Sequence, residues 1–166
     1  MRSLISTALL LVAAVDAAAQ TPTIDRIEIR TIGTYTAELG ERTPDKNIAG
    51  GGLNSIRSYK FVKIGTTVSA QKGVRFGFEF VVMGRPDGAK VPLKSVIIFP
   101  AQGLRNPETG RTQPRDEYMI SATINAVERN GYGFDHEWEA VPGTWTIQLW
   151  DGNRKLAEQN FTIVRP

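Results

Sequence analysis

The single histidine of the chain, His136, is the first place to look for catalytic chemistry. A Ser-His-Asp triad needs an imidazole that takes the proton of the serine, and the sequence lacks the G-x-S-x-G pattern of many such nucleophiles. Alternation places His136 between Phe134 and Trp138, on the apolar side of an expected strand. A histidine there is typical of a partly buried, hydrogen-bonded side chain, or of a pH sensor. A hydrolase that uses His136 with nearby carboxylates remains an alternative function.

Metal-binding side chains are few in this sequence. One histidine and no cysteine exclude the usual zinc ligand sets, and no D-x-D-x-D-G calcium loop occurs. Asp135, Glu137 and Glu139 alternate along one side of an expected strand and could share a cation, although a solvated acidic face explains them better. Asp116 and Glu117 are adjacent, so in a strand they point to opposite faces and do not form a glycosidase pair by themselves. We therefore expect neither a metal site nor paired catalytic carboxylates.

Aromatic side chains are the best candidates for binding a ligand or a partner. Trp150 falls on the side of its strand opposite Trp145, next to a hairpin turn, where an exposed indole could stack on a sugar or anchor a protein. Trp138 and Tyr132 are further candidates, and His136 lies in the same segment. We take Trp150, Trp138, Tyr132 and His136 as candidate binding residues. A carbohydrate-binding module that uses Trp150 is a second alternative function.

The first nineteen residues indicate where the protein works. Met1 and Arg2 form a positive start, an apolar run extends over Leu4–Val15, and the small residues Ala17–Ala19 precede Gln20. This is the layout of a cleaved secretory signal peptide, and a run of 12 residues is too short to span a bilayer. We expect cleavage after Ala19 and a mature protein, beginning at Gln20, that is periplasmic or secreted.

Composition limits the remaining possibilities. Removal of residues 1–19 leaves 147 of the 166 residues, a length typical of one domain. The absence of cysteine excludes disulfides, a thiol nucleophile and a lipid anchor on a cysteine at the expected cleavage point. No second long apolar stretch follows, so we expect no membrane span. The triple glycine Gly50–Gly52 lacks the Lys-Ser/Thr of a phosphate-binding loop, and we expect no cofactor.

The net charge of +3 hides an uneven distribution along the chain. Residues 46–115 contain 12 basic and three acidic side chains, whereas residues 20–45 and 116–166 carry net charges of −2 and −4. A basic surface would suit an envelope protein or an anionic envelope polymer as the partner, while export makes nucleic acid an unsuitable one. The alternative is that basic strands lie beside acidic strands and neutralise them across a sheet.

The hydrophobic pattern is that of strands. In Gly73–Met83 the residues Val74, Phe76, Phe78, Phe80 and Val82 share one face, which predicts a central strand. Similar alternation occurs in seven further segments: Ile24–Ile32, Ser55–Ile64, Val91–Phe99, Glu117–Val127, Tyr132–Glu139, Thr144–Trp150 and Lys155–Val164. Asp151-Gly152-Asn153 supplies a hairpin turn between the last two, and Ala49–Gly52 and Ala101–Pro114 are expected loops. This pattern, with no helical segment, predicts an all-β, antiparallel β-sandwich of the immunoglobulin-like type.

Several segments together resemble a bacterial family of small exported proteins known as domain of unknown function 3859. The resemblance extends from about Ile24 to Val164. Its residues are Gly33, Gly73–Phe80, Phe99-Pro100, Pro142–Trp150 and Phe161-Thr162-Ile163. It implies export and β-structure and assigns no activity or site. With no catalytic motif in the chain, the sequence predicts a non-catalytic binding or interaction module of the bacterial envelope, with the hydrolase and the carbohydrate-binding module as alternatives.

Overall fold

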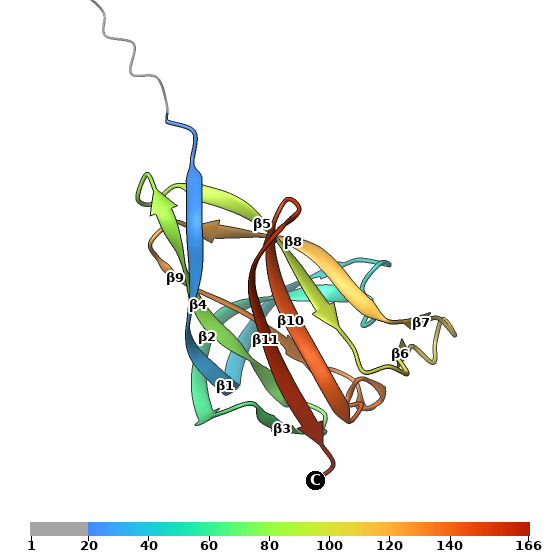
Figure 1. Ribbon diagram of the computed structural model, residues 1–166. Coiled ribbons are helices and arrows are strands. Elements are labelled where there is room, and N and C mark those ends of the chain that lie inside the picture. Colours follow the sequence, from blue (N-terminus) through green and yellow to red (C-terminus); the bar gives the residue numbers. More distant parts are fainter. Residues whose placement is uncertain (1–19) are drawn as a thin grey trace, which may run out of the picture.

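The computed structural model describes residues 20–166, so the expected signal peptide lies outside the described residues. Strands dominate this range (Figure 1). They are β1 (Thr23–Pro44), β2 (Gly52–Ile64), β3 (Thr67–Ser69), β4 (Arg75–Arg85), β5 (Lys90–Ile98), β6 (Leu104–Arg105), β7 (Thr112–Gln113), β8 (Arg115–Thr123), β9 (Val127–Gly133), β10 (Gly143–Asp151) and β11 (Arg154–Val164), with one 3-10 turn, η1 (Glu137–Glu139). No helix within this range is long and apolar enough to cross a membrane.

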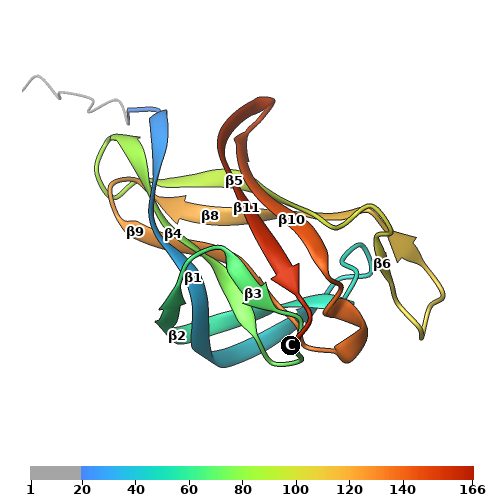
Figure 2. The same ribbon diagram turned by 60° about the horizontal axis from the view of Figure 1, so that its bottom comes forward.

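Two sheets form a sandwich, as the alternating pattern predicted. One sheet has the strand order β2-β1-β4-β9, and the other has the order β3-β11-β10-β5-β8. All neighbours pair antiparallel except β3, which runs parallel to β11. The strands β6 and β7 form a small separate ladder. Figure 2 shows the two layers crossing each other, with β4 and β9 in one and β10 and β11 in the other.

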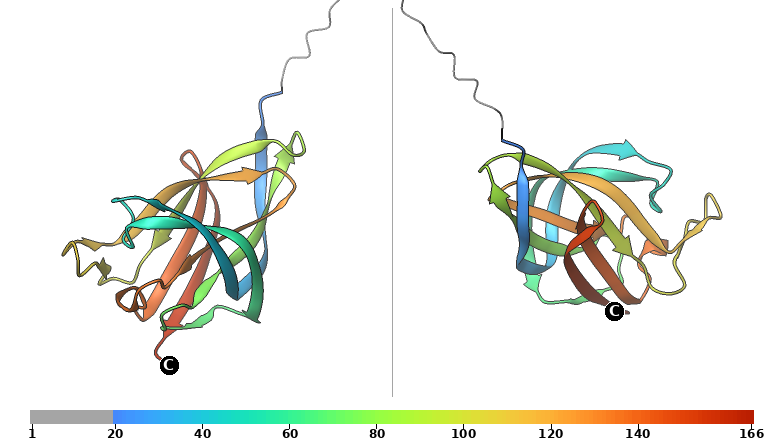
Figure 3. Two further views of the ribbon diagram at one scale, coloured as in Figure 1. Left: turned by 180° about the vertical axis from the view of Figure 1, so that it is seen from behind. Right: turned by 45° about the horizontal axis from the view of Figure 1, so that its top comes forward.

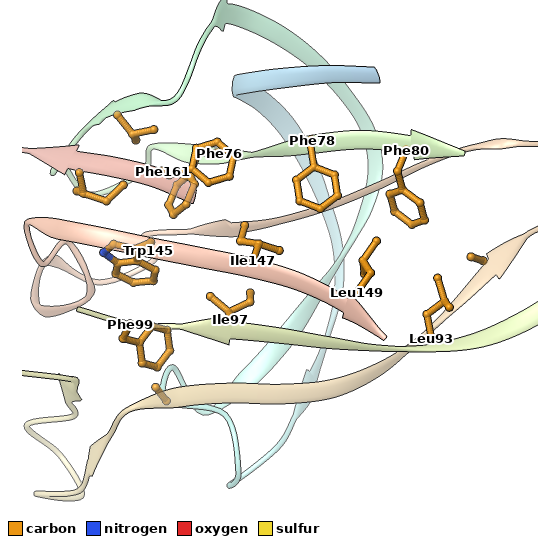
Figure 4. Packing of buried hydrophobic residues seen from close by; sticks show 14 of the residues in the cluster. Phe76, Phe78, Phe80, Leu93, Ile97, Phe99, Trp145, Ile147, Leu149 and Phe161 are labelled. Atoms are coloured by element: carbon orange, nitrogen blue, oxygen red, sulfur yellow. The ribbon is translucent and has the colours of Figure 1, made fainter. Parts of the chain in front are cut away.

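The core lies between these layers and is rich in aromatic rings. Figure 4 shows Phe76, Phe78 and Phe80 of β4 facing Ile147 and Leu149 of β10. All five side chains have no exposed surface, because the period of two in each strand turns every second residue inward. This burial stabilises the fold without disulfides, since the sequence contains no cysteine.

Trp145 occupies the centre of the aromatic cluster. Its ring centroid lies 4.9 Å from that of Phe99, 5.0 Å from that of Tyr132 and 5.5 Å from that of Phe134. The indole Nε1 donates to the carbonyl of Val141 at 2.9 Å, so the polar atom is satisfied inside the core.

A row of glycines crosses the first sheet. Gly33 of β1 lies opposite Gly77 of β4, and Gly77 lies opposite Gly131 of β9. A Cβ on Gly77 or Gly131 would lie 2.2 Å or 2.3 Å from a backbone oxygen of the neighbouring strand, and one on Gly33 would lie 2.1 Å from the carbonyl oxygen of Lys63. Only glycine allows the backbones to approach this closely. Beyond the row, β1 and β2 run together across the back of the molecule (Figure 3, left).

The prediction of a strand over Tyr132–Glu139 was wrong for the second half of this segment. β9 ends at Gly133, and the turn η1 follows. Glu139 bends the chain back, because its carboxylate accepts the backbone N–H of His136 at 2.7 Å. Phe134 is buried as expected, whereas His136 is exposed and not on an apolar strand face.

The strand expected over Glu117–Val127 is also divided. β8 ends at Thr123, and Asn125 adopts a left-handed conformation with φ of 60°, which turns the chain into β9 at Val127. Asparagine tolerates this conformation better than most residues, so its position marks the turn. The expected loop Ala101–Pro114 contains the short β6–β7 ladder.

We expect Trp145→Ala to lower the free energy of unfolding by about 3–5 kcal/mol, the usual cost of truncating a buried aromatic side chain. Trp150→Ala, in the same strand but on its outer side, should cost less than about 1.5 kcal/mol. Urea unfolding followed by circular dichroism measures both. Equal losses in the two variants would contradict the placement of Trp145 in the core.

Candidate functional site: a cleft at the open side of the sandwich

A cleft of about 240 Å³ lies where the two sheets leave one side of the sandwich open. Its walls are β8 of one sheet, β9 of the other, and the far part of the β1–β2 hairpin, residues 36–58, which we call the arm. From the arm, Arg42, Leu53 and Ile56 line the cleft. β8 and β9 are each the last strand of their sheet, so neither has a strand partner on its outer edge among residues 20–166.

The cleft runs along strand edges and not along one sheet face. Five consecutive residues of β9, Arg129–Gly133, line it, and so do the consecutive residues Tyr118, Met119 and Ile120 of β8. Successive side chains of a strand point to opposite faces, so only an edge brings consecutive residues to the same space. Backbone N–H and C=O groups of a free edge are available for pairing with another chain.

The tip of the arm is held down by hydrogen bonds. Ala49 is the centre of this contact: its N–H donates to Asp116 Oδ1 at 2.9 Å, and its carbonyl accepts from Asn106 Nδ2 at 3.0 Å. Gln113 donates to the carbonyl of Asn47 at 2.9 Å, and Gln113 also reaches Asp116 Oδ1 at 3.2 Å. These bonds fix the arm over the cleft, since the groups come from the loop and strand beneath it.

Two of the arginines that line the cleft share one carboxylate. Arg75 forms an ion pair with Asp135 Oδ1, and Arg42 lies 3.6 Å from Asp135 Oδ2. Asn54 of the arm donates to the same oxygen at 2.6 Å. Gly133 makes room for this arrangement, because a Cβ there would lie 2.0 Å from Nη1 of Arg75. Asp135 therefore ties the arm to the sheet.

Arg129, the third arginine of the cleft, has a different environment. Its guanidinium carbon lies 4.9 Å from the ring centroid of Tyr35 and 5.6 Å from that of Tyr59. One nitrogen, Nη1, donates to the Tyr35 hydroxyl at 2.6 Å. Glu79 lies opposite Arg129 in the strand register, but its carboxylate accepts the Tyr59 hydroxyl at 2.9 Å. Within residues 20–166, Arg129 forms no ion pair.

Two buried carboxyl groups also line the cleft. Asp116 is 1% exposed, and burial raises its pKa from 3.8 to about 7, with the nearby Glu139 acting in the same direction. Its Oδ2 is buried without a hydrogen-bond partner among the described residues. Burial likewise raises the pKa of Glu139, against the N–H of His136 and the Tyr132 hydroxyl, which favour its ionised form. Burial therefore disfavours the ionised form of both carboxyl groups beside the arginines.

Tyr132 is the one predicted binding residue that lines the cleft. Its ring packs against Trp145 in the core, and its hydroxyl donates to Glu139 Oε1 at 2.9 Å. Burial raises the pKa of Tyr132 well above its ordinary value, and the negative charge of Glu139 raises it further. Gly50 makes room for the same carboxylate, since a Cβ there would lie 2.6 Å from Glu139 Oε1.

The other predicted binding residues lie outside the cleft. His136 is exposed and stacks on Trp138, with ring centroids 5.6 Å apart and planes at 10°. Trp150 is half-buried on the side of β10 opposite the core, as predicted; Lys94 Nζ lies 5.7 Å from its ring, and its Nε1 donates to Gln148 at 2.9 Å. The structure therefore brings Trp138 and His136 together and leaves Trp150 on the other sheet.

Asp135, Glu137 and Glu139 do not form the acidic strand face considered from the sequence. Asp135 pairs with arginines, and Glu139 is 2% exposed. No cluster of three His, Asp or Glu side chains suited to a metal ion occurs in residues 20–166. Asp116 and Glu117 do point to opposite faces, as predicted, with Asp116 buried and Glu117 exposed.

The sequence analysis missed Asp116 and Arg129 as residues of a site. A signal for Asp116 was present, because it precedes Tyr118, Ile120 and Ala122 in steps of two and so belongs to the apolar face of its strand. No comparable signal existed for Arg129. Its two aromatic neighbours come from β1 and β2, about 70 to 94 residues earlier in the chain, and only the fold brings them to it.

The basic middle of the chain is partly neutralised by its acidic flanks. Arg57 lies 3.8 Å from Glu38, and Arg115 lies 2.7 Å from Glu117. Arg75 pairs with Asp135 in the same way. Arg57–Glu38 joins the paired strands β2 and β1, and Arg75–Asp135 joins β4 to the segment after β9, whereas Arg115 and Glu117 lie two residues apart in β8.

Comparison with known proteins places this architecture in a family. The family model described as domain of unknown function (DUF3859) matches residues 25–163. The chain belongs to this family. No curated protein matches it.

The fold of this DUF3859 protein is shared with a solved structure. An immunoglobulin-like protein (PA1606) from Pseudomonas aeruginosa is 22% identical in sequence, with a TM-score of 0.53. The alignment covers 84% of this chain and 99% of that one. This similarity confirms the immunoglobulin-like sandwich predicted from the strand pattern.

We expect Asp116→Asn to stabilise the protein at pH 8 and to have little effect at pH 4. The folded-state pKa of about 7 lies above the ordinary value of 3.8, so ionisation of Asp116 destabilises the fold as the pH rises from about 4 to about 7. The amide removes that penalty, which is on the order of 2–4 kcal/mol. Urea unfolding at pH 4, 6 and 8 measures the difference.

Glu117→Gln is the matched control for this prediction. The residue is adjacent, exposed and paired with Arg115 on the surface, so its replacement should change stability by less than about 0.5 kcal/mol. A gain for Asp116→Asn that is the same at pH 4 and pH 8 would contradict the assigned pKa.

Proposed function

We propose that this protein is a non-catalytic binding module of the bacterial envelope and that its ligand occupies the open-side cleft. The observation that carries this proposal is the environment of Arg129. Two aromatic rings fix its guanidinium, which forms no ion pair in the described part of the chain. The residue lines a cleft that is bounded by two free strand edges. Half-buried charges in proteins usually have a counter-ion. A ligand with a negatively charged group would supply the missing counter-ion of Arg129.

The composition of the cleft favours binding over covalent catalysis. The residues that line it include no serine, threonine, lysine or histidine. Its buried carboxyl groups are engaged within the fold, since Asp116 accepts the N–H of Ala49 and Glu139 accepts the Tyr132 hydroxyl. His136, on which the hydrolase alternative depends, is exposed and stacked on Trp138 outside the cleft. Apolar side chains of Leu53, Ile56 and Met119 lie beside the arginines, a combination that suits recognition of a group with apolar and charged parts.

Placement in the envelope rests on the first nineteen residues. We expect the protein made with its own leader in a bacterium to appear in the periplasmic fraction with a mass that corresponds to a start at Gln20. Leu10→Arg, which interrupts the apolar run, should leave the protein in the cytoplasm at full length. Recovery of the unaltered chain in the cytoplasm with residues 1–19 attached would contradict export.

Photo-crosslinking in living cells tests whether the cleft is the binding site. A photoreactive phenylalanine in place of Met119, which lines the cleft and is 62% exposed, should form an adduct of defined mass. The same group in place of Val127, which is 60% exposed on β9 and does not line the cleft, is the control and should form none.

Arg129→Gln completes this experiment. We expect it to abolish the adduct at position 119, because the guanidinium supplies the charge that the ligand neutralises. Adducts that are equal at positions 119 and 127, or that persist in Arg129→Gln, would show that the cleft is not the site.

A further inference from the structure

We propose that the ligand of the cleft is the C-terminal end of an extended polypeptide. Its last residues add as a strand to the free edge of β8, its terminal carboxylate binds Arg129, and an apolar side chain near its end packs on Ile56, Met119 and Ile120. This inference rests on the proposed function, since it names the chemistry of the ligand at the same site.

The free strand edges favour a polypeptide over other ligands. Tyr118, Met119 and Ile120 line the cleft consecutively, so the unpartnered backbone edge of β8 faces it. An extended peptide satisfies such an edge with main-chain hydrogen bonds, whereas a lipid or a sugar leaves the N–H and C=O groups to water. Side chains of Ile56 and Ile120 are half-buried and Met119 is exposed, which leaves an apolar surface beside the edge.

The environment of Arg129 favours a carboxylate. A guanidinium presents five N–H donors in a plane, and only the bond from Nη1 to Tyr35 is made among the described residues. The rings of Tyr35 and Tyr59 hold its plane in place, so two parallel donors are preorganised for a carboxylate. In a peptide that lies extended along an edge, the free carboxylate is at the C-terminus.

The acidic groups of the cleft argue against a more highly charged anion. Asp135 is ionically paired with Arg75 and lies near Arg42, so these two arginines are already engaged. Asp116 and Glu139 line the same space. A phosphate with two negative charges interacts less favourably with these acidic groups than a carboxylate, which adds a single charge opposite Arg129.

The first test uses synthetic peptides and the mature exported protein. The probe is a pool of fluorescein-labelled hexapeptides, randomised except for a last residue that is Val, Leu or Phe, with either a free or an amidated C-terminus. We expect fluorescence anisotropy to show binding of the free-carboxylate pool and at least tenfold weaker binding of the amidated pool.

Two arginine variants test whether the peptides bind in the cleft. Arg129→Gln should weaken binding of the free-carboxylate pool at least tenfold and abolish the difference between the two pools. Arg57→Gln, an exposed arginine of the arm that pairs with Glu38 and does not line the cleft, should leave binding unchanged.

A second pair of variants keeps the test valid if Arg129→Gln unfolds. Met119→Asp places a negative charge at the mouth of the cleft and should weaken binding at least tenfold, whereas Val127→Asp should have no effect. Both residues are exposed apolar side chains on edge strands, so folding should tolerate either change equally.

The outcomes separate this inference from the proposed function. Equal binding of free and amidated peptides, or binding that Met119→Asp does not change, would overturn the peptide C-terminus as the ligand. If fluorescent dodecanoate binds with dependence on Arg129 and the peptides do not, the cleft is a binding site and the peptide assignment is wrong. If no probe binds and position 119 forms no adduct in cells, the proposed function is wrong as well.

Discussion

The close approach of three strand backbones at Gly33, Gly77 and Gly131 is the constraint on which the cleft depends. A Cβ at Gly131 would lie 2.3 Å from a backbone oxygen of β4 and 3.0 Å from the Tyr35 hydroxyl. Because that space is empty, Tyr35 lies over the sheet and orders the guanidinium of Arg129. Beyond this row β1 and β2 continue together as the arm (Figure 3). Residues of the arm form the third wall of the cleft.

The cleft is built at some cost in stability. Asp116 is buried with one oxygen unpartnered within the described chain, and its carboxylate holds the arm through the N–H of Ala49. The fold tolerates this cost because the burial of the aromatic core around Trp145 contributes more free energy of unfolding than the buried carboxylate of Asp116 removes. A destabilising polar group that shapes a concave surface is more typical of a binding site than of a structural element.

Fold and site differ in how far the sequence could predict them. The strand pattern predicted the sandwich and the inward faces of β4 and β10, since a period of two depends only on neighbouring residues. The expected strand over Tyr132–Glu139 failed after Gly133, because Glu139 caps the backbone of His136 and turns the chain. Of the aromatic candidates, Tyr132 lines the cleft, whereas Trp150 lies on the outer side of β10.

The all-β class, the buried faces of the strands and the family could be read from the sequence, because they follow from local alternation and from motifs along the chain. Which polar residues line the cleft depends on the tertiary structure. Arg129 meets Tyr35 and Tyr59, and Asp116 meets Ala49, across separations of about 67 to 94 residues. Such contacts depend on how the sheet bends and which edges stay free, and these properties belong to the packed strands together and not to any one segment.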